Sequence, residues 1–486
     1  MSLSKVFKGS FWLYLRIVTI NLAGFLYWMV ISAIGGSEIV GLTSATVALA
    51  WTTSSLFSLG VDIGVRRFLG MYAAKNNRRE VASYFWSTLL FYMVLHVSIG
   101  LTITGLGLLG VSISNFTPEM LIYAGIIVML NFTVVFDSLL ISFLKTKVLF
   151  IAALAGNLVK LSLGITLVML GWGWIGAVIG YVIFMPVYAL IAGRYSITIT
   201  GLAAAFNLQA LKETLKAGYV SWLPETITIL GQYLGVLTLF GLKGASETGS
   251  YYVTFAIASV VYMAGFSILN IMFPVLSGME DGRKRMGWRA TKVSLAIATP
   301  MAFALIAYPE VLLSLLGKEY IEASPALQML ALSIPAALLT AGVNSLVYAY
   351  GMYTAVLTLG LAVNLPRIAA YAPFSSMFGG LGTALSYTSG AYIGLAAALM
   401  VARRVGLKIN AKHLLLATLA PLGLTALLYE LSVPWFLGAP VLLAASYMLY
   451  LKAKVLTKTE LKELSYAFAS KETVQRAYAK LRPILA

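Results

Sequence analysis

The sequence lacks cysteine altogether and has only two histidines, His96 and His413, among its 486 residues. Disulfide bonds, thiol catalysis and cysteine-ligated metals are therefore excluded, and so is a histidine-rich metal site. Charged residues are also scarce, at 10% of the chain, whereas a soluble domain carries about 25%. We expect a protein that is not a soluble enzyme and that uses no cofactor and no metal.

Hydrophobic residues make up 60% of the chain, and the mean hydropathy is +0.90. The apolar runs exceed about 18 residues, which is typical of transmembrane helices rather than of membrane strands. The sequence therefore predicts an all-α polytopic membrane protein with about fourteen spans. The expected spans lie near 10–34, 39–64, 81–108, 117–143, 148–170, 174–194, 214–241, 247–275, 288–316, 324–350, 353–371, 379–402, 411–430 and 434–451.

Basic residues outnumber acidic ones, with 34 Lys and Arg against 17 Asp and Glu, a formal net charge of +17. Cytoplasmic loops of polytopic proteins are rich in Lys and Arg. With a cytoplasmic N-terminus, nearly all loop cations fall inside, and the outer loops hold only Lys243 and Lys318. We therefore expect a cell-membrane protein with both termini cytoplasmic and no nucleic-acid partner. The chain also contains no G-x-x-x-x-G-K-[ST] motif, so ATP hydrolysis is not expected.

The two halves of the chain match each other. A shift of 209 residues places SEIVGLTSATVALAWTTSSLF, from Ser37, on SETGSYYVTFAIASVVYMAGF, from Ser246. Further matches, at shifts of 207 and 206, are DSLL from Asp137 with NSLV from Asn344, NLVKL from Asn157 with NLPRI from Asn364, and WIGAVIGY from Trp174 with GLGTALSY from Gly380. Matches in one order at nearly one offset indicate a duplicated six-span unit whose copies cross the membrane in the same sense.

The duplication predicts a domain organisation in four parts. They are an N-terminal six-helix lobe at 1–200, a C-terminal six-helix lobe at 210–403, two additional spans at 404–455 and a tail at 456–486. Apolar residues recur in the tail at a mostly three- or four-residue spacing among charges, which is typical of a basic amphipathic helix on the inner leaflet. A solvated charged helix is the alternative.

Two parallel six-span bundles, two further C-terminal spans and the stretch FSLGVDIGVRRFLGMYAAKNNRREVASYFWSTLL from Phe57 resemble the multidrug/oligosaccharidyl-lipid/polysaccharide exporter superfamily. Within it, the sequence is similar to the polysaccharide-transport branch, which flips lipid-linked oligosaccharides. The resemblance implies two lobes in a V that alternate between inward-open and outward-open forms, without enzymatic activity. It also implies a lipid-linked oligosaccharide as substrate, membrane lipids and glycan-assembly enzymes as partners, and function as a monomer.

Two basic residues lie deep within predicted spans. Ionisable side chains at such positions cost about 2.5 to 3.5 kcal/mol and usually face a bundle interior or a cavity. Lys160 and Arg367 lie roughly 18 to 22 Å into a core of about 30 Å, and they align at the shift of 207. Asn157 and Asn364 precede them by one helical turn on the same face. We expect these four residues to bind the substrate's diphosphate; neutralisation by a carboxylate on a neighbouring helix is the alternative.

Further charged residues lie toward the inner side of the membrane. Arg16 aligns with Glu225 at the shift of 209, so the two residues form either an ion pair between lobes or separate sites. In the second case Arg16 joins the cationic substrate cavity, as first-span arginines do in related lipid flippases. Asp62 and Asp137 are expected to form local ion pairs near the ends of their spans, and Asp62 with Arg66 is also a candidate gate.

The leading hypothesis is a flippase that moves a polyprenyl-diphosphate-linked oligosaccharide to the outer leaflet. A cation-coupled multidrug exporter of the same superfamily is the first alternative. Such an exporter should have an acidic cavity, whereas the deep charges here are three basic residues against one acidic residue. A membrane glycosyltransferase or polymerase is a further alternative, but it would need catalytic groups on a sizeable outer loop, and the outer connections are short.

Overall fold

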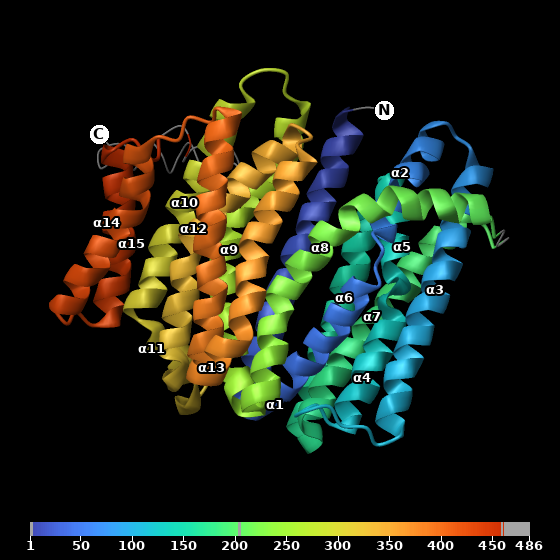
Figure 1. Ribbon diagram of the computed structural model, residues 1–486, viewed down its shortest axis with the longest axis horizontal. Coiled ribbons are helices and arrows are strands. Elements are labelled where there is room, and N and C mark those ends of the chain that lie inside the picture. Colours follow the sequence, from blue (N-terminus) through green and yellow to red (C-terminus); the bar gives the residue numbers. More distant parts are fainter. Residues whose placement is uncertain (1–2, 203–205, 458–459, 461–486) are drawn as a thin grey trace. The chain divides into compact units, whose positions relative to one another are not determined.

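The computed structural model describes residues 3–202, 206–457 and 460, and in them the chain is almost entirely helical (Figure 1). The helices are α1 Leu3–Leu56, α2 Val61–Ala74, α3 Arg78–Leu108, α4 Pro118–Met129, η1 Leu130–Thr133, α5 Val134–Ser142, α6 Thr146–Leu167, η2 Val168–Trp172, α7 Gly173–Thr200, α8 Leu208–Lys243, α9 Ala245–Gly278, α10 Arg283–Ala307, α11 Pro309–Ser314, η3 Lys318–Ala323, α12 Ser324–Ala349, α13 Tyr353–Val405, α14 Ala411–Glu430 and α15 Trp435–Lys452. The all-α prediction is confirmed.

Eleven helical stretches among the described residues are long and apolar enough to cross a membrane. Three of them, Phe11–Leu56, Thr146–Thr200 and Tyr353–Val405, have 46, 55 and 53 residues, and one crossing needs about 20. The chain is therefore a multi-pass membrane protein. Each of the three longest stretches has room for two crossings, and the total of about fourteen stays a prediction.

Glycines divide two of these long helices. Gly36 in α1 and Gly379 in α13 have φ angles of 75° and 55°, a region that residues with a Cβ rarely enter. The next residue after each break donates its backbone N–H to a distant carboxylate, at 2.7 Å from Glu319 Oε1 and 2.8 Å from Glu247 Oε1. A carboxylate at the start of each following helical segment also complements the positive end of its dipole.

Two predicted spans run across a helix break. The interval 39–64 contains the end of α1 at Leu56 and the start of a separate helix, α2, which follows a residue of positive φ. The interval 288–316 contains the end of α10 at Ala307 and the short helix α11. Val61, Val65 and Leu69 are fully buried on one face of α2. Their four-residue spacing is that of an amphipathic helix. In the sequence its apolar residues follow directly on the preceding apolar run, so the two helices were predicted as one span.

Helices α2 and α8 cross at a point made of small residues. A Cβ on Gly60 would lie 2.1 Å from the carbonyl oxygen of Gly218, and one on Gly64 would lie 2.2 Å from that of Thr214. Because backbone atoms cannot move aside as a flexible side chain can, this close packing depends on glycine.

We expect Gly64→Ala to destabilise the protein by about 1 to 3 kcal/mol, because the added methyl group overpacks the crossing. The midpoint of thermal unfolding of the purified protein in detergent measures the effect. Gly24→Ala is the matched control, because a Cβ on that α1 residue meets no atom within 4 Å. Equal midpoints for the two variants would contradict this account of the crossing.

Contacts divide the chain into two compact units. Unit 1 is Met1–Ile257, Leu312–Met329 and Gly360–Gly390; unit 2 is Ala258–Val311, Leu330–Leu359 and Ala391–Ala486. In unit 1, α6 packs against α7 and α1, and α3 packs against α4, whereas in unit 2 α10 packs against α14 and α15. All residues predicted to form the substrate site belong to unit 1. The four-part domain division stays a prediction, and the amphipathic tail lies almost wholly outside the described residues.

The internal repeat is visible in the packing of unit 1. Ser37 and Ser246, which align at the shift of 209, form a hydrogen bond of 2.8 Å between their hydroxyl groups. Residues related by a two-fold axis touch their own counterparts only beside that axis. The contact is therefore the one expected where a pseudo-two-fold axis passes between α1 and α9.

A second pair of contacts shows the repeat with exchanged partners. A Cβ on Gly164 would lie 2.4 Å from the hydroxyl oxygen of Tyr27, and one on Gly235 would lie 2.8 Å from Cε1 of Tyr371. Gly235 lies 208 residues after Tyr27, and Tyr371 lies 207 residues after Gly164. Each copy thus packs one tyrosine ring on one glycine. In the first copy α1 supplies the ring and α6 the glycine, whereas in the second copy α8, the counterpart of α1, supplies the glycine and α13 supplies the ring.

Candidate functional site

Lys160, on α6, is 5% exposed and lies against two aromatic rings. Its Nζ is 3.5 Å from the ring centroid of Tyr181 on α7 and 4.6 Å from that of Tyr27 on α1. Such cation–π contacts contribute about 2 kcal/mol or more where water is excluded. Within the part of the chain that the structure describes, no carboxylate forms an ion pair with Lys160. The alternative hypothesis was that a carboxylate on a neighbouring helix neutralises Lys160. In the structure its described neighbours are the faces of two tyrosine rings instead.

Arg367, on α13, repeats this arrangement. It is 6% exposed, and its Cζ lies 3.7 Å from the ring centroid of Tyr387. Its Nε donates a 3.0 Å hydrogen bond to the carbonyl oxygen of the same tyrosine. The side chain fits over Gly390, where a Cβ would lie 2.3 Å from the arginine Cγ. For this cation too, the described residues supply no carboxylate partner.

The two tyrosines under the cations are themselves related by the repeat. Tyr181 and Tyr387 are the last residues of the matched segments WIGAVIGY and GLGTALSY. Sequence reasoning missed their role, although the match was the signal that could have found them. The duplication thus preserved a cation on one helix and the ring beneath it on the next.

A continuous series of aromatic side chains joins the two cation sites within unit 1. Ring centroids are 5.5 Å apart from Tyr181 to Trp28, 4.6 Å from Trp28 to Tyr252, 6.4 Å from Tyr252 to Phe255 and 5.5 Å from Phe255 to Tyr387. These separations are those of interacting aromatic pairs. The path offers ring faces between two positive charges, an arrangement suited to an anion with attached sugars.

The asparagines predicted beside the cations are buried, and each bonds to its own helix. Asn157 Nδ2 donates to the carbonyl oxygen of Ala153 at 2.8 Å, and Asn364 Nδ2 donates to that of Gly360 at 2.9 Å. Asn364 Oδ1 also accepts a 3.4 Å hydrogen bond from Arg367. One N–H of each amide is thereby used. Their role in orienting a substrate stays a prediction.

Arg16 belongs to a different cluster. Its Nη2 is 2.5 Å from Asp137 Oδ2, and Tyr188 donates a hydrogen bond to the other oxygen of that carboxylate. Arg16 is thus paired with Asp137, on α5, and not with Glu225. The expectation that Asp137 pairs with a cation near its own helix end is wrong, because its partner lies 121 residues away in the sequence.

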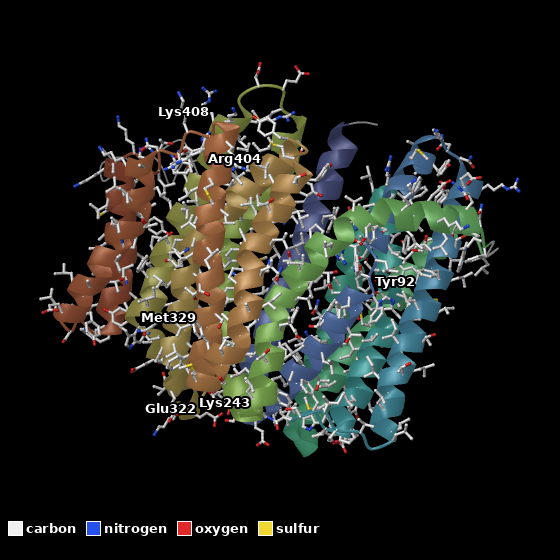
Figure 2. All side chains as sticks on the ribbon, in the orientation of Figure 1. Tyr92, Lys243, Glu322, Met329, Arg404 and Lys408 are labelled. Atoms are coloured by element: carbon white, nitrogen blue, oxygen red, sulfur yellow. The ribbon has the colours of Figure 1, made fainter. Side chains whose placement is uncertain are left out.

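The remaining predicted residues lie together. Asp62 and Arg66 form the expected local pair on α2, with 3.7 Å between Oδ2 and Nη2. Glu225, exposed on α8, interacts electrostatically with both. Tyr92, labelled in Figure 2, interacts electrostatically with the two carboxylates as well. A gating role for this group stays a prediction.

Fixed cations with aromatic surroundings are suited to bind phosphate oxygens and to pack against sugars. Among the described residues, no carboxylate forms an ion pair with Lys160 or Arg367. The same residues contain no group of three or more His, Asp or Glu placed to hold a metal ion. Both cations are buried, so ligand access requires the aromatic side chains over them to move.

The family model described as "Polysaccharide biosynthesis protein" matches residues 45–325. A search of curated protein sequences finds no match.

Among solved structures, the chain is similar to lipid II flippase MurJ in an inward closed conformation, with 15% identity, a TM-score of 0.71 and coverage of 90% of this chain and 97% of that one. It is also similar to an inward-facing multidrug resistance MATE family transporter of the MOP superfamily, with 16% identity, a TM-score of 0.58 and coverage of 81% and 98%. A MOP superfamily transporter from Pyrococcus furiosus, with 16% identity and a TM-score of 0.55, matches over 83% and 95%. At these identities the likeness shows the shared fold.

Proposed function

The chain belongs to the polysaccharide biosynthesis protein family and has the fold of MOP superfamily transporters, and from this premise we propose that it flips a polyprenyl-diphosphate-linked oligosaccharide from the inner to the outer leaflet. The observation that carries the proposal is the repeated pair of buried cations. Lys160 and Arg367 each lie on a repeat-matched tyrosine, and neither has a carboxylate partner in the described chain. A diphosphate carries about two negative charges and has an oxygen for each cation.

Each side chain has a distinct part in the proposal. The cations bind the diphosphate, while Asn157 and Asn364 orient phosphate oxygens or sugars through their second amide N–H. The ring faces of the aromatic series pack against the sugars. Cation–π contacts hold each charge in place without cancelling it, so a diphosphate can displace a ring face without first breaking a salt bridge.

Access is proposed to alternate between the two sides of the membrane, as the duplicated architecture favours. Arg16 guides the substrate from the inner side, and the group of Asp62, Arg66 and Glu225 acts as a gate that rearranges with the helices. The protein works as a monomer without enzymatic activity, and it receives its substrate from glycan-assembly enzymes.

A cation-coupled drug exporter is the second candidate, and one observation favours it. Asp62, Asp137 and Glu225 lie in the same part of unit 1, and Asp62 interacts electrostatically with the other two. In the described part of the chain, their ion-pair partners are Arg16, for Asp137, and Arg66, for Asp62. Acidic groups within a membrane protein are suited to bind H⁺ or another cation.

Transport by the purified protein in liposomes decides between the candidates. We expect delivery of a polyprenyl-diphosphate oligosaccharide to the outer leaflet, slower delivery of the corresponding monophosphate and no transport of a cationic dye. The diphosphate is preferred because it engages both cations. Dye transport without oligosaccharide delivery would refute the proposal in favour of the exporter.

We also propose that the termini and the basic loops are cytoplasmic, because nearly all loop cations then lie inside. The chain has no cysteine, so single variants can be labelled cleanly. Lys243→Cys should react with an impermeant thiol reagent in intact cells, whereas Lys145→Cys and Lys284→Cys should react only after permeabilisation. Labelling of either of these two from outside would overturn the orientation.

A further inference from the structure

Unit 2 contains a basic pocket where the N-terminal ends of α10 and α14 meet the segment that follows α15. Its volume is about 570 Å³. The ionisable side chains that line it are Arg285, Arg289, Lys292, Lys408, His413 and Glu460. Among the described residues, four Lys and Arg side chains therefore face a single carboxylate. None of these residues takes part in the proposed transport site, which lies in unit 1.

The carboxylate of Glu460 is held by two of the cations. Its Oε1 is 3.0 Å from Arg289 Nε and 3.3 Å from Lys292 Nζ, although Lys292 is only 8% exposed. Its Oε2 accepts a 2.8 Å hydrogen bond from the backbone N–H of Thr457, whose hydroxyl accepts the Glu460 N–H at 3.2 Å. This reciprocal arrangement between Thr457 and Glu460 is a capping box, and it holds the Glu460 carboxylate in the pocket.

Glu460 is ionised in this position. Burial raises its pKa, but the Thr457 hydrogen bonds, the charge of Lys292 and the hydrogen bond from Arg289 together lower the pKa below its ordinary value. Among the described side chains that line the pocket, one negative charge therefore stands against four positive ones, a difference of three positive charges. Arg285 and Lys408 form no ion pair within the described chain.

The end of α14 adds to this positive potential. The side chain of Asn410 accepts the backbone N–H of His413 at 3.1 Å, which satisfies one of the free donors at the start of a 20-residue helix. The remaining N–H groups and the helix dipole favour an anion at this end. The N-terminal end of α14, the buried Lys292 and the exposed Arg285 and Lys408 thus all face the same pocket.

We propose that this pocket binds a phosphate group and that the Glu460 carboxylate occupies part of it as an internal substitute. The phosphate comes from an anionic lipid headgroup or from a soluble phosphorylated compound. The position favours the lipid: α10 and α14 are both apolar enough to span a membrane, and Trp288, a residue type enriched at membrane interfaces, also lines the pocket. This binding is independent of which substrate is transported.

The test uses the full-length protein in neutral detergent and counts bound lipid by native mass spectrometry. The probes are phosphatidylglycerol, zwitterionic phosphatidylcholine and inorganic phosphate as competitor. Lys408→Gln should weaken phosphatidylglycerol binding about tenfold, because one charge-assisted contact is lost while the Glu460 pairs stay intact. Glu460→Gln should strengthen it severalfold, because the competing carboxylate becomes neutral. Lys408 follows the end of α13 and is labelled in Figure 2.

Lys243→Gln is the matched control, because it removes an exposed cation at the end of α8 in unit 1 that does not line the pocket. Its affinity for phosphatidylglycerol should equal that of the unaltered protein. Competition by inorganic phosphate at concentrations near those of the lipid would support a soluble ligand, and its absence would support a headgroup. If phosphatidylglycerol binds no better than phosphatidylcholine, or if Lys408→Gln and Lys243→Gln have the same effect, the proposal is wrong.

Discussion

Replacing Lys160 and Arg367 together with glutamine is expected to reduce delivery of a diphosphate-linked oligosaccharide about 100-fold, and each single replacement about tenfold. The reason is that each cation supplies a charge-assisted hydrogen bond to the diphosphate, and among the described residues no further cation contacts the rings of the aromatic series. The double variant should remain folded. Two buried charges are removed rather than added, and glutamine still packs against Tyr181 and Tyr387.

Transport is measured in liposomes and normalised to folded protein. Lys147→Gln with Arg404→Gln is the matched double control. Lys147 is on the same helix as Lys160 and also lies over an aromatic ring, 5.5 Å from that of Trp12, but it is exposed. Arg404 is exposed near the end of α13 (Figure 2). If the Lys160 and Arg367 double variant transported as well as this control, the two cations would be structural and the anion site would lie elsewhere.

Much of the fold was predictable because the membrane imposes long apolar runs. The interval 411–430 coincides with α14, and 434–451 differs from α15 by one residue at each end, since turn and polar residues bound both runs. The separate helix α2 was not predictable in the same way. Its break depends on the backbone conformation at Gly60, with a φ of 63°, inside a stretch that is apolar on both sides.

The candidate site was also predictable only in part. Lys160 and Arg367 stand out in the sequence because the cost of burying a charge makes each exceptional. Their tyrosine partners do not, because an aromatic residue in a span is ordinary and only the packing of α6 on α7 brings Tyr181 to the lysine. The pairing of Arg16 was also beyond the sequence. Alignment of the two repeats shows which positions are equivalent, but not which residues touch. Equivalent positions touch only beside the pseudo-two-fold axis, as Ser37 and Ser246 do, so the alignment of Arg16 with Glu225 did not predict a contact.

Replacing Asp137 with leucine is expected to destabilise the protein by about 3 to 5 kcal/mol, because it leaves the Arg16 guanidinium partly buried without a counter-charge. The side chains of the two residues are 18% and 15% exposed, so water compensates little of the loss. Tyr188 would lose its acceptor in the same variant. The folded fraction after extraction and the midpoint of thermal unfolding measure the effect. Asp62→Leu is the control, because its partner Arg66 is 40% exposed and such a pair contributes about 1 kcal/mol or less.

The double variant Arg16→Met with Asp137→Leu separates the roles of the pair, because replacing both charges by apolar groups is often neutral for stability. We expect it to fold nearly as well as the unaltered protein but to deliver substrate poorly, since the cation that guides entry is gone. Normal delivery by this variant would mean that the pair only fixes α1 against α5. A loss of stability as large as that of Asp137→Leu alone would mean that the cost arises from lost packing rather than from an unpaired charge. The comparison thus assigns Arg16 to substrate entry or to helix packing by measurement.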